Sequence, residues 1–302
     1  MSVIIICKIM HWRKVVVNLT KRNKLPQKKK RKKVILFLVE GDTDKITLEA
    51  SIDKFISGLE IEDIIIKFAS MNKREGGKIA NGGDFTSDKE VYPGNIEEKV
   101  SYRIDLMKDD GKIYPKDVVK IIQLVDLDGA YVDKDIIIKR DDRKSKIENR
   151  VYFEDRIETD NDFSTRRNLQ RKRENLDFLS SKETFKLGSK TIDYSIYFFS
   201  SNLEHFLYNE QNLSLDDKVV KSYEFERDCN IDLNYFYSKM WTGDYLLKDM
   251  TYMESWDYIR KNGNKSLSRC SNINILFSDL KEWAERYKNN RQDILENVTE
   301  SD

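Results

Sequence analysis

The sequence predicts an α/β protein whose core is a parallel sheet flanked by helices, followed by a mostly helical C-terminal part. Two apolar runs, at 34–39 and 118–125, each end in acidic residues, and segments of helical spacing separate the apolar runs. Strands that alternate with helices favour a parallel sheet, because parallel strands need long crossover connections. Ligands of such sheets gather beyond the carboxyl ends of the strands, so we expect both acidic segments at one edge.

The composition allows a buried core but identifies no partner. Of 302 residues, 39% are apolar, and 54 basic and 53 acidic side chains almost cancel. The cysteines, Cys7, Cys229 and Cys270, lie far apart and indicate neither a disulfide framework nor a thiolate zinc site. The apolar stretch near the beginning is too short to span a bilayer. We therefore expect a cytoplasmic protein without a membrane partner.

The expected organisation has three parts. Residues 1–33 form a basic N-terminal extension, residues 34–212 an α/β domain, and residues 213–302 a mostly helical region. The expected elements are a strand at 34–39, a helix at 43–59, a strand at 61–68, an inserted Gly-rich loop at about 72–94, a helix at 95–107, a strand at 118–125, a helix at 164–179, a strand at 192–199 and a helix at 202–212.

Two basic clusters are candidates for binding the nucleic-acid backbone. Nine of the thirteen residues from Lys21 to Lys33 are Lys or Arg, and a second cluster spans 166–173. Lysine and arginine neutralise phosphates, although runs of like charge are often solvated without a partner. The candidates are Lys28, Lys29, Lys30, Arg31, Arg166, Arg167, Arg171 and Arg173.

The acidic residues after the two apolar runs form a chemically coherent set. Glu40 follows the first run, and Asp126 and Asp128 follow the second. Carboxylate oxygens are the ligands that Mg²⁺ and Mn²⁺ prefer, and a small carboxylate set leaves positions for water and a substrate phosphate. Gly41 allows a sharp turn beside Glu40. The spacing of Asp126 and Asp128 would let both face one side of an extended segment.

These motifs resemble the Toprim domain of topoisomerases, bacterial primases and several nucleases. Residues 40–44 match its E-G-x-x-D motif, and Asp126-Leu127-Asp128 matches its D-x-D motif. The resemblance implies that Glu40, Asp126 and Asp128 are catalytic residues that bind Mg²⁺ or Mn²⁺, with Asp44 in support. The sequence separation of 86 positions between Glu40 and Asp126 exceeds that of a minimal Toprim core and implies an insertion.

The resemblance also implies a function. The chain looks like small phage-defence Toprim nucleases of the OLD, RloB or PARIS-effector kind, which predicts cleavage of DNA or RNA in antiviral defence. A partner protein such as an ATPase would then control the activity, and a homo-oligomer is also compatible. The alternatives are a non-catalytic binding or sensing module with the same fold, in which the acids cap turns, and a nucleotidyl transferase.

Three further residues are candidates for the same site. Glu204 follows the apolar strand expected at 192–199 and could complete the metal site, although it would also suit the first turn of a helix. His205 could assist proton transfer near neutral pH, but a lone histidine is more often structural. Asp84, in the Gly-rich loop, could approach the metal or belong to an ordinary surface turn.

Overall fold

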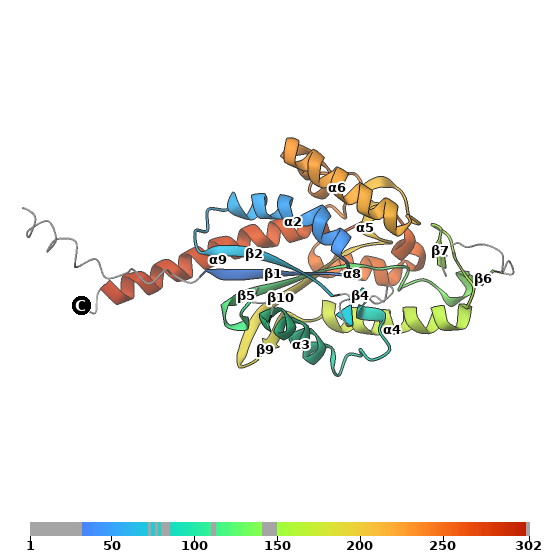
Figure 1. Cartoon of the computed structure of the whole chain (residues 1–302), viewed down its shortest axis with the longest axis horizontal. Coiled ribbons are helices and arrows are strands. Elements are labelled where there is room, and N and C mark those ends of the chain that lie inside the picture. The colour runs from blue at the N-terminus through green and yellow to red at the C-terminus, as the bar shows by residue number, and fades with distance from the viewer. Residues whose placement is uncertain are drawn as a thin grey trace, which may run out of the picture. The chain divides into compact units, whose positions relative to one another are not determined.

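A computed structural model describes residues 32–71, 74–75, 78–79, 85–109, 113–140 and 150–299, with side chains for most of them. The described residues belong to one compact unit that starts at Lys32 (Figure 1). The predicted phosphate-binding residues at 28–31 and the candidate Asp84 lie outside the described residues.

The central sheet is dominated by parallel strands, as the sequence predicts. Its order is β2-β1-β5-β10-β9, in which β1, β2, β5 and β10 run parallel and β9 pairs antiparallel with β10. Nearly all side chains of β1 and β5 are buried, which explains their unbroken apolar runs. The strands are β1 (Lys33–Val39), β2 (Ile64–Ser70), β5 (Val118–Asp126), β9 (Thr184–Leu187) and β10 (Lys190–Phe199).

Two small sheets were not expected from the sequence. A three-stranded sheet has the order β6-β8-β7, and β3 pairs with β4 within the predicted Gly-rich loop. Strands of two or three residues are too short to produce a recognisable alternation of apolar and polar residues. These strands are β3 (Arg74–Glu75), β4 (Lys78–Ile79), β6 (Ile137–Lys139), β7 (Arg150–Tyr152) and β8 (Ile157–Thr159).

The helices follow the predicted pattern, and the region after residue 213 is mostly helical. The predicted helix at 202–212 is shorter than expected, because Asn209 adopts a left-handed conformation that ends it. None of the described helices is long and apolar enough to cross a membrane. The helices are α2 (Asp42–Ser57), α3 (Ile96–Asp109), α4 (Asp162–Ser180), α5 (Leu203–Tyr208), α6 (Leu215–Ile231), α7 (Leu233–Met240), α8 (Tyr252–Lys261) and α9 (Ile273–Thr299).

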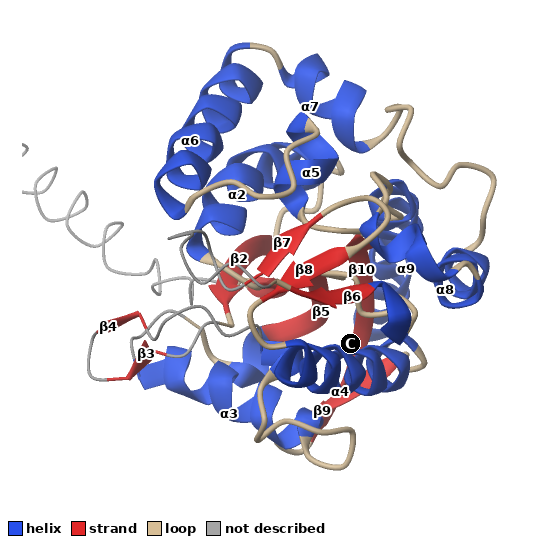
Figure 2. Ribbon diagram, turned by 90° about the vertical axis from the view of Figure 1, so that its right-hand side faces the viewer, coloured by secondary structure: helices blue, strands red, loops and turns tan. Residues whose placement is uncertain are grey.

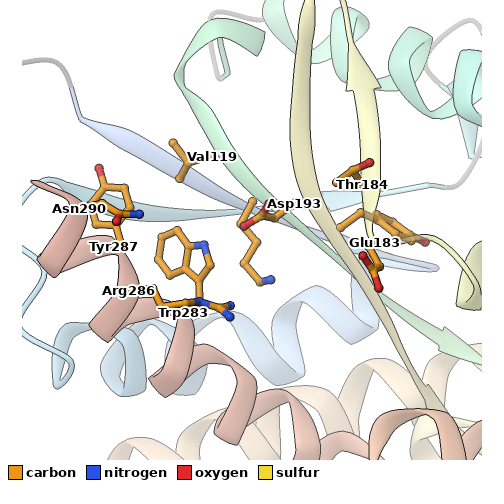
Figure 3. Close-up of a pocket in the computed structure, with 10 residues that line it drawn as sticks. Val119, Glu183, Thr184, Asp193, Trp283, Arg286, Tyr287 and Asn290 are labelled. Carbon is orange, nitrogen blue, oxygen red and sulfur yellow. The ribbon is translucent and has the colours of Figure 1, made fainter.

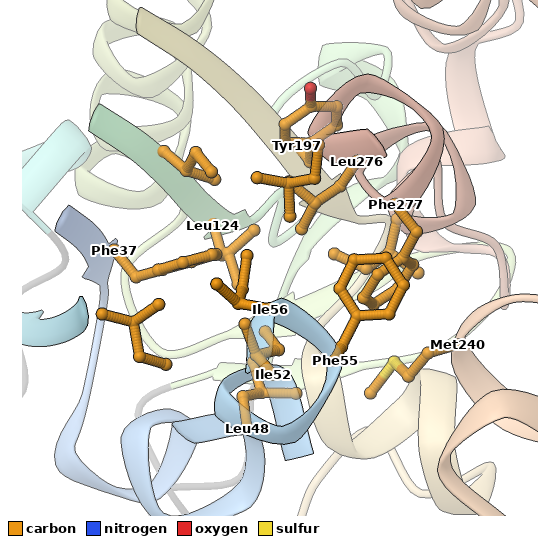
Figure 4. Close-up of a cluster of buried hydrophobic side chains, with 14 of the residues drawn as sticks. Phe37, Leu48, Ile52, Phe55, Ile56, Leu124, Tyr197, Met240, Leu276 and Phe277 are labelled. Atoms are coloured by element: carbon orange, nitrogen blue, oxygen red, sulfur yellow. The ribbon is translucent and has the colours of Figure 1, made fainter. Parts of the chain in front are cut away.

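Helices cover both faces of the sheet (Figure 2). Residues of α2, α5, α6, α7 and α9 pack against one face, and residues of α3, α4 and α8 pack against the other. On the first face, Phe277 of α9 lies with its ring centroid 5.0 Å from that of Phe55 in α2 and 5.7 Å from that of Phe236 in α7 (Figure 4). The C-terminal helices therefore share one core with the sheet.

Removal of the Phe277 ring should destabilise the whole compact unit. Phe277 is buried, so Phe277→Ala should lower the free energy of unfolding by about 3–5 kcal/mol through lost burial and the resulting cavity. Phe163→Ala on exposed α4 is the matched control and should change it by less than about 0.5 kcal/mol. Urea unfolding followed by circular dichroism measures both, and separate transitions for sheet and C-terminal helices would contradict a shared core.

Candidate active site

The carboxyl edge of the parallel sheet brings the predicted acidic residues together. Glu40 follows β1, and Asp126 is the last residue of the neighbouring strand β5. The Asp126 N–H donates to Oε1 of Glu40 at 3.2 Å, and the Leu203 N–H at the start of α5 donates to Oδ1 of Asp126 at 3.0 Å. Residues distant in sequence thus meet because their strands are adjacent and parallel.

Asp128 reaches this edge through a turn, whereas the sequence predicts an extended segment. The prediction of an extended segment is therefore wrong. The strand ends at Asp126, and Asp128 and Gly129 have φ angles of 50° and 75°. The Asp128 N–H donates to the carbonyl of Ser201 at 2.9 Å, which joins the turn to the segment after β10. A Cβ on Gly129 would lie 2.8 Å from Cδ1 of Ile157, so the turn leaves no room for a side chain there.

Lys172 of α4 connects two of the predicted ligands. Its Nζ lies 2.7 Å from Oδ2 of Asp128 and 3.4 Å from Oε1 of Glu40. The Lys172 side chain is only 1% exposed, whereas the two carboxylates are partly open to solvent. A buried ammonium in such a place stabilises carboxylates that would otherwise repel each other. No pattern in the sequence distinguishes Lys172, because it lies within a basic cluster typical of an exposed helix face.

Glu204 occupies a similar ion pair on the other side of the site. It lies in the first turn of α5, is buried, and has Oε2 3.0 Å from Nζ of Lys218 in α6. Burial alone would lower the pKa of Lys218, but the carboxylates of Glu204 and Asp126 raise it above its usual range. No motif in the sequence singles out Lys218, since it lies 14 residues beyond Glu204 on a separate helix.

Asp44 supports the turn that carries Glu40. Its Oδ2 accepts the Gly41 N–H at 2.8 Å, which caps the first turn of α2. Burial raises the pKa of Asp44 to about 6, and the nearby charges of Glu204 and Asp128 add to this rise. Asp44 therefore belongs to the same electrostatic cluster, and its supporting role in a metal site stays a prediction.

The pKa of Asp126 is raised well above its usual value. Burial is the largest cause, followed by the negative charges of Asp44, Asp128 and Glu204. Five carboxylates therefore share one small region with two lysines, Lys172 and Lys218. A cation placed among the acids would reduce the repulsion that raises these pKa values.

The oxygen donors of this cluster suit a hard divalent cation, but they are directed to other partners in this arrangement. Among the described residues, no three Asp, Glu, His or Cys side chains are arranged to hold one ion. Oδ2 of Asp128 faces Lys172, Oδ1 of Asp126 accepts a backbone N–H, and Glu204 faces Lys218. Metal binding would require the carboxylates to turn away from these donors.

His205 is buried beside Glu204 on α5. Burial and the charge of Arg269 lower the pKa of its imidazole to about 4. The ring is therefore neutral at physiological pH and accepts a proton less readily there than an ordinary histidine. A role in proton transfer stays a prediction, and this low pKa counts against it.

Three of the predicted phosphate-binding arginines of α4 bind backbone carbonyls of the chain itself. Arg166 donates to the carbonyl of Ile137, Arg171 to that of Ser87, and Arg173 to those of Ala130 and Val132. These guanidinium groups are partly buried, whereas Arg167 is exposed. The backbone contacts fix the position of α4, and the predicted phosphate contacts of these arginines stay a prediction.

The chain matches no family model, and no curated protein or solved structure shows significant similarity to it.

The raised pKa of Asp44 predicts a pH dependence of stability. Because the folded-state pKa of about 6 exceeds the ordinary 3.8, its contribution is full below about pH 4 and is lost as the pH rises through 6. Asp44→Asn keeps an acceptor for the Gly41 N–H but removes the charge. We expect its free energy of unfolding to rise relative to wild type by about 1–3 kcal/mol between pH 4 and 7. Urea unfolding at several pH values tests this, and parallel curves for both proteins would exclude it.

The turn after β5 predicts that alanine substitution at two glycines lowers the stability by different amounts. Gly129 and Gly188 both have positive φ, but only at Gly129 would a Cβ meet close neighbours. Gly129→Ala should cost about 2–4 kcal/mol and Gly188→Ala about 1 kcal/mol. Chemical denaturation measures the difference, and equal costs would show that the neighbours of Gly129 give way easily.

Proposed function

We propose that this chain is a Mg²⁺- or Mn²⁺-dependent nuclease with a Toprim-like site at the carboxyl edge of its parallel sheet. The observation that carries the proposal is the convergence of Glu40, Asp126 and Asp128 at two adjacent strand ends. Two of these acids, Glu40 and Asp128, pair with the buried Lys172. Acids gathered at such an edge, at a cost in electrostatic repulsion, are typical of functional sites and uncommon in structural ones.

The residues of the chain have distinct parts in this proposal. Glu40, Asp126 and Asp128 would hold the cation, with Glu204 as a further ligand. A bound Mg²⁺ or Mn²⁺ supplies an activated water and neutralises charge on the scissile phosphate. Before the cation binds, Lys172 holds Glu40 and Asp128 in place. Once the cation displaces it from Asp128, the ammonium group would add a positive charge near the phosphate. Lys218 restrains Glu204 from the opposite side.

Lys172 and Lys218 also favour a second candidate function. Because the two lysines already compensate part of the negative charge, the acids keep their places without a metal, as expected for a non-catalytic binding module of the same fold. The two functions differ in their dependence on divalent cations. An effector role in phage defence, controlled by a partner such as an ATPase, is part of the first proposal and is supported by the motif resemblance alone.

A cleavage assay tests the proposed nuclease. The full chain is incubated with plasmid DNA, single-stranded DNA, total RNA and transfer RNA, with Mn²⁺, Mg²⁺ or chelator. We expect cleavage of at least one substrate that requires the metal and falls at least about 100-fold in Glu40→Gln and in Asp126→Asn, because each change removes a metal ligand. The substrate that is cut decides between DNA and RNA.

The matched control is Asp53→Asn, which removes an exposed carboxylate of α2 outside the cluster. Asp53→Asn should cleave like wild type. Cleavage that persists with chelator, or that survives in both Glu40→Gln and Asp126→Asn, would contradict the proposal. Absence of cleavage in all substrates, with unchanged melting temperature in Mn²⁺, would favour the binding module.

A further inference from the structure

A second pocket lies near the beginning of the central strands, away from the acidic cluster. Its volume is about 570 Å³, and residues of β5, β9, β10 and α9 line it (Figure 3). Lys120 in the pocket wall and Asp126 in the acidic cluster are six residues apart on β5, which places them about 20 Å apart along the strand. The pocket is therefore separate from the proposed active site.

Lys120 is an unusual residue for its position. It lies in a strand whose neighbouring side chains are apolar and buried, it is 7% exposed, and it lines the pocket. Within the described structure, the ammonium group of Lys120 forms no hydrogen bond or ion pair. Asp193, its cross-strand neighbour in β10, and Asp279 act on it through their charges. Buried charges in proteins are normally paired, because an unpaired one is costly. An ammonium group in the wall of a pocket, without a hydrogen-bonded partner, is suited to an anionic ligand.

The rest of the pocket wall narrows the class of ligand. Arg286 adds a second cation that has no ion pair within the described structure. The rings of Trp283 and Tyr287 stack with centroids 5.0 Å apart and provide an aromatic wall (Figure 3). Glu183 and Asp193 also line the pocket, and their carboxylates would repel a bare anion but accept hydrogen bonds from hydroxyl or amino groups.

A ligand for this pocket should therefore combine an anion, hydrogen-bond donors and a planar ring. We propose that the pocket binds a mononucleotide, with its phosphate at Lys120 and Arg286, its hydroxyl or amino donors at Glu183 and Asp193, and its base against Trp283 and Tyr287. The volume lies within the range of about 300–1,000 Å³ that small-molecule sites occupy. The proposal does not depend on the proposed nuclease activity.

A binding titration tests this proposal. The full chain is titrated with AMP, GMP, CMP and UMP, and binding is followed by tryptophan fluorescence and by calorimetry. We expect at least one nucleotide to bind saturably and to quench Trp283, with the quenching lost in Trp283→Phe. Lys120→Met and Arg286→Met should each weaken binding at least about tenfold, because each removes a charge-assisted contact with the phosphate.

Controls separate this site from others on the molecule. Lys281→Met removes an exposed lysine of α9 outside the pocket and should leave the affinity unchanged. Glu40→Gln should also leave it unchanged, which separates binding here from binding at the acidic cluster. Circular dichroism shows whether each variant is folded. If Lys120→Met does not fold, Arg286→Met still tests the phosphate contact, because Arg286 is exposed.

Several results would overturn the proposal. These are the absence of saturable binding by all four nucleotides, an unchanged affinity in folded Lys120→Met or Arg286→Met, and loss of binding in Glu40→Gln. Inorganic phosphate or adenosine that binds as tightly as the nucleotide would also overturn it, because one half of the ligand would then contribute nothing.

Discussion

The repulsion among carboxylates at one edge of the sheet is the constraint on which the arrangement of this molecule depends. Glu40, Asp126 and Asp128 are held near one another by strand ends that cannot move apart without disrupting the core. Like charges at such distances are tolerated only with nearby cations or with raised pKa values, and both occur here. Lys172 and Lys218 reach the cluster from α4 and α6, so helices on both sides of the sheet contribute to one electrostatic balance.

This balance links the fold to the proposed chemistry. Asp44 and Glu204 lie in the first turns of α2 and α5, and the backbone N–H of Leu203 donates to Asp126. Hydrogen bonds therefore connect the acids at the strand ends with the backbone N–H groups in the first turns of the helices. A divalent cation would replace part of the positive charge that the lysines provide, which makes metal binding and the positions of α4 and α6 mutually dependent.

The sequence predicts the parallel sheet and the meeting of Glu40 with Asp126, because apolar runs and acids at strand ends are local signals. It misses what depends on tertiary packing. Lys172 belongs to a basic run, and only the fold places it beneath Asp128. Asp128 leaves the extended conformation because Gly129 permits a tight turn. Lys120 shows the same limit, since an apolar run with one lysine does not indicate a pocket. The nuclease function and the Toprim resemblance stay predictions.

The central claim is that the strand-end carboxylates hold a divalent cation, and its most direct test is the location of Mn²⁺ in crystals of the full chain. We predict an anomalous scattering peak bounded by Glu40, Asp126 and Asp128, with Lys172 displaced from Asp128, and loss of the peak in Glu40→Gln. A crystal soaked in Mn²⁺ that shows no peak at this edge, with Lys172 still bound to Asp128, would contradict the claim.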